Sequence, residues 1–392
     1  GGLRAVRGDG IWDDWEGSDN MRILFACGGT AGHINPAIAV ANFIKARHPE
    51  AEILFAGNPK GMEARLVPKA GFAFAPIEIM GFQRKLTWFN VRYNFRSVGC
   101  LMLSWGRAKK LIRDFAPDMI VGTGGYVSGP ILREGAKLGV KTVTHESNAF
   151  PGVTTKVLAR TADKVLISVE EAKRYLPRGR EYIVTGNPVR EEILFADREK
   201  ARKKFGVGDR VCIVSFGGSL GARRLNEAVA GLMAWEQRRG GVFHIHATGS
   251  IEKDRFPQML AAAGVDPCAP GLDIRTYIDD MPDCLAAADL VISRSGAMTL
   301  SELEASGTAS VLIPSPNVAE NHQYHNAMVL AEHDAAVVIE EKDLTPERLS
   351  GRVEELCRNP QTLRRLGRNA QAMAIIDANE RIYSEIMALY KA

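Results

Sequence analysis

The sequence lacks several features that would place the protein in a class at once. No apolar run approaches the roughly 18 residues of a transmembrane helix, so we expect no membrane span. The net charge of +4 is small for 392 residues and gives no reason to expect a nucleic-acid partner. The six cysteines have no paired spacing, which favours reduced thiols of a cytoplasmic protein over disulfides or a zinc site.

Common cofactor and metal motifs are also missing. No glycine turn ends in the Gly-Lys-[Ser/Thr] of a phosphate-binding P-loop, and Cys27 occupies the first glycine position of a dinucleotide fingerprint. No Asp-x-Asp sequence occurs, and the adjacent Asp279 and Asp280 would point to opposite faces of an extended chain. His244 and His246 would share one face of a strand without a third ligand, so we interpret them as structural. The sequence therefore predicts no cofactor and no bound metal.

A strand that runs into a glycine turn occurs twice. The first copy ends in Gly28-Gly29-Thr30-Ala31-Gly32-His33 and the second in Gly217-Gly218-Ser219-Leu220-Gly221-Ala222. Glycine lets the backbone approach a ligand closely, and the helix that follows offers free N–H groups to an anion. Apolar strands alternate with helical patterns from end to end, which predicts two α/β domains with parallel sheets.

The expected strands and domain boundaries follow from this alternation. We expect residues 1–20 to be a disordered extension or a vector-derived remnant rather than a signal peptide. A first domain should span 21–187 and a second 188–373, divided at the turn cluster Thr185-Gly186-Asn187-Pro188. The expected strands are 22–27, 52–56, 74–79, 118–122, 142–145 and 164–168, then 211–216, 242–247, 273–278, 289–293, 310–313 and 336–339.

Residues 81–113 are basic and contain no acidic residue. Arg92 and Arg96 are among eight basic residues interleaved with aromatic and aliphatic side chains. This composition suits an anionic membrane surface. A solvated helix face with its apolar side in the core fits equally well on composition alone.

Two polar residues at helix starts have both a functional and a structural interpretation. His33 lies where a helix N-terminus disfavours a protonated imidazole, so it should be neutral and able to accept a proton. Glu302 lies about one turn into the helix after Ser293-Arg294-Ser295-Gly296, where a carboxylate can accept bonds from ribose hydroxyls. Alternatively, His33 bonds locally and Glu302 complements the helix dipole, and the residues alone favour these structural interpretations.

An ordered set of motifs resembles the MurG-type N-acetylglucosaminyltransferases of bacterial peptidoglycan synthesis. The matching segments are 28–36, 122–130, 145–152, 185–190, 217–222, 277–281, 294–299 and 321–326. The resemblance implies the GT-B glycosyltransferase fold, in which two Rossmann-like domains face a central cleft and a C-terminal helix, here 374–392, returns to the first domain. It implies inverting transfer of N-acetylglucosamine from UDP to the muramyl 4-hydroxyl of lipid I, the undecaprenyl-diphosphoryl acceptor, without a metal in the nucleotide site.

The same resemblance implies partners and site residues. The partners are UDP-GlcNAc, lipid I and the anionic cytoplasmic face of the cell membrane, with cell-wall synthesis proteins as further candidates. The resemblance makes His33 the candidate general base. It therefore favours the functional interpretation of both His33 and Glu302 over the structural one. Gly124, Gly125 and Tyr126 belong to the acceptor side, together with the interfacial segment that contains Arg92 and Arg96. The donor contacts fall on Thr30, Ala31, Gly32, Asn148, Arg190, Ser219, Ile278, Ala297, Met298, Thr299, Leu300, Ser301, Glu302 and Gln323.

The sequence departs from the family at a few positions. His322 and Ser147 stand where glutamine is usual, and Leu220 stands where glutamine often follows the serine. Two alternatives remain at this point: another GT-B enzyme that uses a UDP-sugar, such as a diacylglycerol glycosyltransferase or an epimerase, and a non-catalytic scaffold that binds nucleotide sugars.

Overall fold

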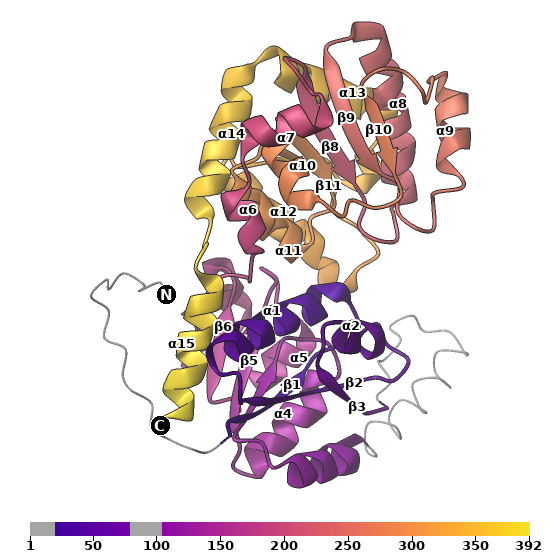
Figure 1. Cartoon of the computed structure of the whole chain (residues 1–392). Helices are drawn as coiled ribbons and strands as arrows, with labels where there is room; N and C mark the ends of the chain where they lie inside the picture. The colour runs from indigo at the N-terminus through magenta and orange to yellow at the C-terminus, as the bar shows by residue number, and fades with distance from the viewer. Residues whose placement is uncertain (1–19, 79–103) are drawn as a thin grey trace, which may run out of the picture.

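The computed structural model describes residues 20–78 and 104–392 and shows two α/β lobes (Figure 1). Within these residues the strands form a seven-stranded and a six-stranded sheet, and every pair of neighbouring strands is parallel. The alternation in the sequence is therefore confirmed as two parallel-sheet domains.

The first sheet has the order β3-β2-β1-β4-β5-β6-β7. Its strands are β1 (Arg22–Ala26), β2 (Glu52–Gly57), β3 (Ala73–Pro76), β4 (Met119–Gly122), β5 (Lys141–Glu146), β6 (Lys164–Ile167) and β7 (Ile183–Val184). The helical segments of this domain are α1 (Ala31–Arg47), α2 (Glu63–Lys69), residues 104–115, α4 (Ser128–Lys137), α5 (Val153–Leu158) and the 3₁₀ helix η1 (Glu170–Tyr175). The strand order changes direction between β1 and β4, since the chain adds β2 and β3 on one side of β1 and β4 to β7 on the other. A ligand site is expected at the carboxyl ends of the strands at such a switch point.

The second sheet has the order β10-β9-β8-β11-β12-β13. Its strands are β8 (Val211–Phe216), β9 (Val242–Ala247), β10 (Leu272–Arg275), β11 (Leu290–Ser293), β12 (Ser310–Leu312) and β13 (Val337–Val338). The helices around it are α6 (Glu191–Phe195), α7 (Arg198–Phe205), α8 (Arg223–Arg239), α9 (Phe256–Ala263), α10 (Met281–Ala287), α11 (Ala297–Ser306), η2 (Ala319–Asn321), α12 (His322–Glu332), η3 (Glu341–Asp343), α13 (Pro346–Arg358) and α14 (Pro360–Met373).

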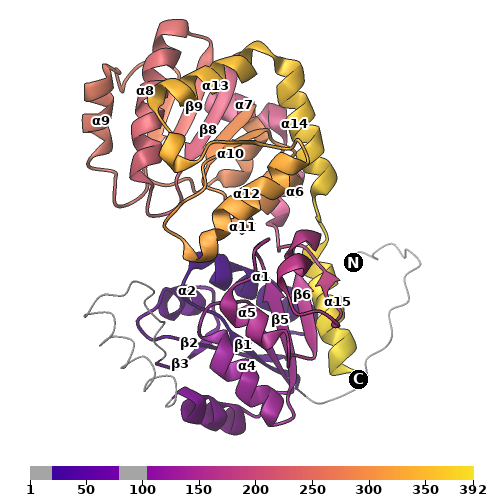
Figure 2. The same cartoon turned by 180° about the vertical axis from the view of Figure 1, so that it is seen from behind.

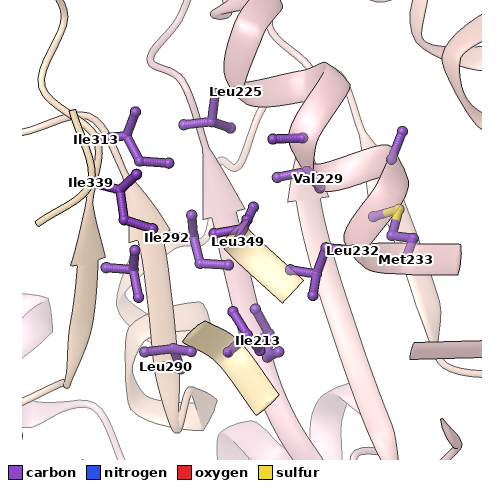
Figure 3. Packing of buried hydrophobic residues seen from close by; sticks show 14 of the residues in the cluster. Ile213, Leu225, Val229, Leu232, Met233, Leu290, Ile292, Ile313, Ile339 and Leu349 are labelled. Carbon is purple, nitrogen blue, oxygen red and sulfur yellow. The ribbon is translucent and has the colours of Figure 1, made fainter. Parts of the chain in front are cut away.

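Burial of apolar side chains on both faces of each sheet stabilises the domains. In the second domain, Leu225 and Val229 of α8 pack toward Ile213 of β8, and all three side chains are fully buried (Figure 3). Burying one such side chain contributes about 1.5–3 kcal/mol. Local signals set the helix ends: Asp197 caps α7 by accepting from Lys200 N, and Gly206 ends it in the left-handed conformation.

The last helix, α15 (Ala378–Tyr390), leaves the second domain and packs on the first (Figures 1 and 2). Its buried Ile382 and Ile386 belong to the same apolar cluster as residues of β1 and α1. Before it, the chain passes close to the segment that links the two sheets: a Cβ added to Gly186 would lie 2.7 Å from the Cβ of Ile375. The two connections between the domains therefore lie side by side.

Every strand expected from the sequence is present, with ends that differ by at most about three residues. The two-residue strand β7 was not expected, because two residues are too short to show a period. The boundary at 187–188 stays a prediction. Residues 1–19, Arg92 and Arg96 lie outside the described residues, and no helix within the described ranges is long and apolar enough to span a bilayer.

The domains meet at a small cavity of about 20 Å³ with polar atoms in its wall. Ser147 and Asn187 line it from the first domain, and each has a buried side-chain oxygen, Oγ and Oδ1 respectively, without a hydrogen-bond partner. Glu304 of α11 lines it from the second domain and is 8% exposed. Burial, together with the nearby Glu171 carboxylate, raises the pKa of Glu304 to about 8. The cavity between the domains is therefore lined by a carboxyl group that is protonated at neutral pH.

We expect Glu304→Gln to change how stability depends on pH. The folded protein keeps the Glu304 proton up to pH 8, whereas the unfolded chain releases it near 4.5, so wild-type stability falls as pH rises between these values. Glutamine removes this dependence, so the Tm of the variant should rise relative to wild type from pH 5 to pH 8. The unfolding free energy of the variant, relative to that of wild type, should grow by up to about 1.4 kcal/mol for each pH unit in this range.

Thermal unfolding followed by circular dichroism at a series of pH values measures this difference. Glu192→Gln, on the exposed face of α6, serves as the control and should track wild type. Parallel curves for Glu304→Gln and wild type would contradict the assigned protonation state.

Candidate functional site

Several helices that follow strands have no side-chain cap, and three of them carry residues expected at the site. These are α1 after β1, α8 after β8 and α11 after β11, and their N-cap residues are Thr30, Ala222 and Gly296. None of them has an acidic residue in its first turn. Their first-turn N–H groups are therefore suited to anionic oxygens such as those of a diphosphate.

His33 is the third residue of α1, and its ring has a defined orientation. Its Nδ1 lies 3.2 Å from the carbonyl oxygen of Gly28 and 3.4 Å from Thr30 Oγ1. The main-chain oxygen of His33 accepts a 2.6 Å hydrogen bond from Thr123 Oγ1. Because a carbonyl oxygen only accepts, we assign the proton of the neutral ring to Nδ1. Nε2 then carries the lone pair, which is the arrangement that a general base requires.

Gly124 and Gly125 lie directly against this turn. A Cβ on Gly124 would lie 2.6 Å from His33 Cδ2, and one on Gly125 would lie 2.2 Å from the Gly28 oxygen. Both glycines have positive φ, 107° and 81°, so a side chain would be strained in conformation as well as in space. Tyr126 follows them and its ring lies near Gly29. The residues expected on the acceptor side therefore also shape the surroundings of His33.

A second imidazole approaches His33 from the other domain. His322 is the first residue of α12, and its Nδ1 donates to the Ala319 oxygen at 2.8 Å. Burial lowers the pKa of His322, and its interaction with His33 lowers that pKa further. In both views α12 reaches the first domain beside α1 (Figures 1 and 2). The departure from the family at 322 thus lies next to the candidate base.

Asn148 lies in a polar contact between the domains. Its side-chain and main-chain N–H groups donate to Glu146, and its Oδ1 accepts from Asn326 Nδ2 of α12 at 3.1 Å. Asn326 Oδ1 accepts from the main-chain N of Ala149 at 2.8 Å. One asparagine of the second domain therefore holds the loop after β5 by two hydrogen bonds.

Arg190 and Glu302 form an ion pair that links the start of α6 to α11. Arg190 Nε lies 2.8 Å from Glu302 Oε1, and the glutamate side chain is 16% exposed. Burial raises the pKa of Glu302, and the Arg190 charge opposes that rise. The bond uses Nε, and within the described residues the terminal nitrogens of Arg190 have no hydrogen-bond partner. The guanidinium can therefore hold Glu302 and a phosphate oxygen at once.

The other expected donor residues fall into two groups: some are at least partly exposed, and the others already make contacts within the protein. Ser219 lies exposed in the second glycine turn, while Met298 and Thr299 are half-buried in the first turn of α11 with Ala297. Thr30, Ala31 and Gly32 form the start of α1.

The residues of the second group already have contacts within the protein. Ser301 Oγ accepts from Asn187 Nδ2 at 3.2 Å, and Gln323 Oε1 accepts from Ser315 N at 2.9 Å. Leu300 and Ile278 are buried, so their side chains belong to the core. Each of these residues would contact a ligand through its backbone, or its side chain would first have to leave the contact that it makes within the protein. The roles of all these donor residues stay predictions.

His244 and His246 form a buried polar network away from the domain interface. Ser215 Oγ lies 2.6 Å from His244 Nε2 and 2.7 Å from His246 Nδ1, and His244 Nδ1 binds the Glu236 carboxylate at 2.8 Å. Their structural interpretation is confirmed by this burial and bonding. In the part of the chain that the structure describes, no group of three His, Cys, Asp or Glu residues is placed to hold a metal ion.

Sequence reasoning missed Glu63, which lies fully buried beneath the first glycine turn. Its Oε2 accepts from Gly29 N at 3.3 Å and its Oε1 accepts from Asn58 N at 2.9 Å. The available signal was an acidic residue that follows the glycine-containing loop after β2. That signal could not show that this loop reaches the turn after β1.

Comparisons with known proteins agree with this geometry. Residues 23–167 match the glycosyltransferase family 28 N-terminal domain and residues 212–382 match the family 28 C-terminal domain. The fold is similar to a crystal structure of Acinetobacter baumannii MurG, with a TM-score of 0.76, 27% identity, and coverage of 94% of this chain and 99% of that one.

Two relatives carry the name UDP-N-acetylglucosamine–N-acetylmuramyl-(pentapeptide) pyrophosphoryl-undecaprenol N-acetylglucosamine transferase. The Acetivibrio thermocellus protein is 43% identical over 95% of this chain and 99% of its own length. The Bacillus cytotoxicus protein is 40% identical over 95% of this chain and 100% of its own length. At this identity and coverage, the chain belongs to the family 28 glycosyltransferases that carry this name.

Proposed function

We propose that the protein transfers N-acetylglucosamine from UDP-GlcNAc to the muramyl 4-hydroxyl of lipid I and so forms lipid II. The observation that carries this proposal is the match, at 40–43% identity over nearly the full length of both chains, to transferases named for this donor and acceptor. The site supports it, because anion-accepting helix starts and a histidine with a free ring nitrogen lie at the carboxyl ends of the two sheets.

His33 is the general base of this reaction. Its Nε2 takes the proton of the acceptor hydroxyl while the hydroxyl oxygen attacks the anomeric carbon of the donor sugar. The bond from that carbon to the β-phosphate oxygen breaks with its electron pair leaving on UDP, so the anomeric configuration inverts. The Gly28 carbonyl keeps Nδ1 protonated and thereby keeps Nε2 available.

Charge that develops on the departing UDP is stabilised from the second domain. The first turn of α11 offers uncapped N–H groups, and Arg190 contributes a guanidinium held in place by Glu302. Glu302 in turn binds the ribose hydroxyls. These roles assign residues 188–373 to the donor and residues 21–187 to the acceptor and the membrane.

The acceptor is anchored by a polyprenyl chain, so the enzyme works at the cytoplasmic face of the membrane. We assign the interfacial contact to the basic and aromatic segment 81–113, in which Arg92 and Arg96 lie outside the described residues. Attraction to anionic lipid contributes about 1 kcal/mol for each well-placed basic residue.

Transfer of radiolabelled sugar from UDP-GlcNAc tests the acceptor directly. We expect labelled product with lipid I and none with diacylglycerol. Transfer to diacylglycerol would indicate another GT-B activity. Binding of UDP-GlcNAc without any release of UDP in the presence of lipid I would indicate a scaffold.

His33→Ala should lower kcat by about 10²–10⁴-fold, because the acceptor hydroxyl then loses its base. The KM for UDP-GlcNAc should change little, since the donor contacts remain. His333→Ala, an exposed histidine at the end of α12, serves as the matched control. An unchanged kcat in His33→Ala would exclude the base role.

Reversing the charge of both Arg92 and Arg96 to Glu should weaken binding to anionic vesicles, and the loss should shrink as salt rises. Vesicle co-sedimentation at low and high salt measures this. Arg364 and Arg368 on α14 are both exposed, so reversing them changes the net charge equally in the second domain and should leave binding intact. Equal losses in the two double variants would contradict a specific contact at 81–113.

A further inference from the structure

We propose that Glu63 is a positioning residue for His33 and acts on its ring through the peptide group between Gly28 and Gly29. This inference rests on the proposed function, in which His33 is the base. It adds a buried carboxylate to a site in which His33 has no carboxylate of its own within hydrogen-bond distance.

One peptide group connects the two side chains. Its C=O, from Gly28, lies 3.2 Å from His33 Nδ1, and its N–H, from Gly29, lies 3.3 Å from Glu63 Oε2. The group is planar and polarisable, and a carboxylate that accepts from the N–H increases the electron density on the carbonyl oxygen. That oxygen then accepts more strongly from the Nδ1–H of His33. The chain of bonds thus runs from carboxylate through peptide to imidazole.

The surroundings of Glu63 fit a carboxylate closely. A Cβ added to Gly28, Gly57 or Gly61 would lie 2.4, 2.4 or 2.3 Å from an atom of the Glu63 side chain. Its other oxygen accepts from Asn58 N, and in the described ranges it makes no ion pair with a basic side chain. In the part of the chain that the structure describes, the carboxylate is therefore held by backbone amides and not by a basic side chain.

Other groups around His33 act in the opposite direction. The N-terminus of α1 disfavours a positive charge on a side chain in its first turn, His322 and His33 interact electrostatically, and Tyr126, near Gly29, is the further titratable group at this turn. A base must still hold the proton that it takes from the hydroxyl. Glu63 supplies the compensating negative charge, because it stabilises the imidazolium formed in that step.

Titration of the His33 imidazole by NMR in the full-length protein, with its signal identified by comparison with His33→Ala, tests the inference. In Glu63→Gln the His33 titration and the acid limb of the kcat–pH profile should both move to lower pH, since the carboxylate charge near the ring is lost. The plateau kcat should fall about 3–10-fold, with the KM for UDP-GlcNAc unchanged.

Glu134→Gln is the matched control, because Glu134 is a buried carboxylate on α4 of the same domain and bonds to Lys137. It should leave the His33 titration and the acid limb in place. Glu63→Asp keeps the charge but withdraws it by one methylene, so its titration curve and its acid limb should lie between those of wild type and Glu63→Gln. If Glu63→Gln does not fold, a downward shift in Glu63→Asp supports the inference and no shift overturns it.

An unchanged His33 titration in a folded Glu63→Gln variant overturns the inference, even if its Tm falls. Failure of the proposed function gives a different result. In that case His33→Ala keeps its turnover, while the NMR titration still reports whether Glu63 acts on His33.

Discussion

The close approach of two glycine segments is the contact on which the candidate site depends. Gly125 packs against the carbonyl oxygen of Gly28, and Gly124 packs against the ring of His33. Adjacent strands β1 and β4 bring these segments together, since both end at the same edge of the sheet. With no side chain between them, the first turn can hold the imidazole by its Nδ1 and leave Nε2 for an acceptor hydroxyl.

The second domain contributes charged and polar residues that form the other half of the candidate site. Arg190 and Glu302 are already paired, so in the proposed reaction their geometry does not have to form when the donor binds. Asn326 joins α12 to the loop after β5, and His322 at the start of the same helix lies beside His33. One helix of the second domain therefore contacts the loop after β5 and also interacts with His33, the proposed base.

The sequence predicted the parts of this structure that depend on short-range patterns. Apolar runs gave the strands, and the glycine turns gave the helix starts, because both signals lie within a few neighbouring residues. The two-residue β7 gave no signal. Glu63 escaped prediction because its partner, Gly29, lies in another loop of the folded chain. For the same reason, the sequence could not show that Ser301 and Gln323 already hold partners within the protein.

The return of α15 to the first domain has a mechanical consequence. The second domain is attached by two chain segments instead of one (Figure 1). These segments contact each other at Gly186 and Ile375. Because both covalent connections lie at one place, any relative movement of the two domains has to pivot there. The second connection also removes some of the freedom that a single linker would leave, which limits how far α12 can move from the first domain.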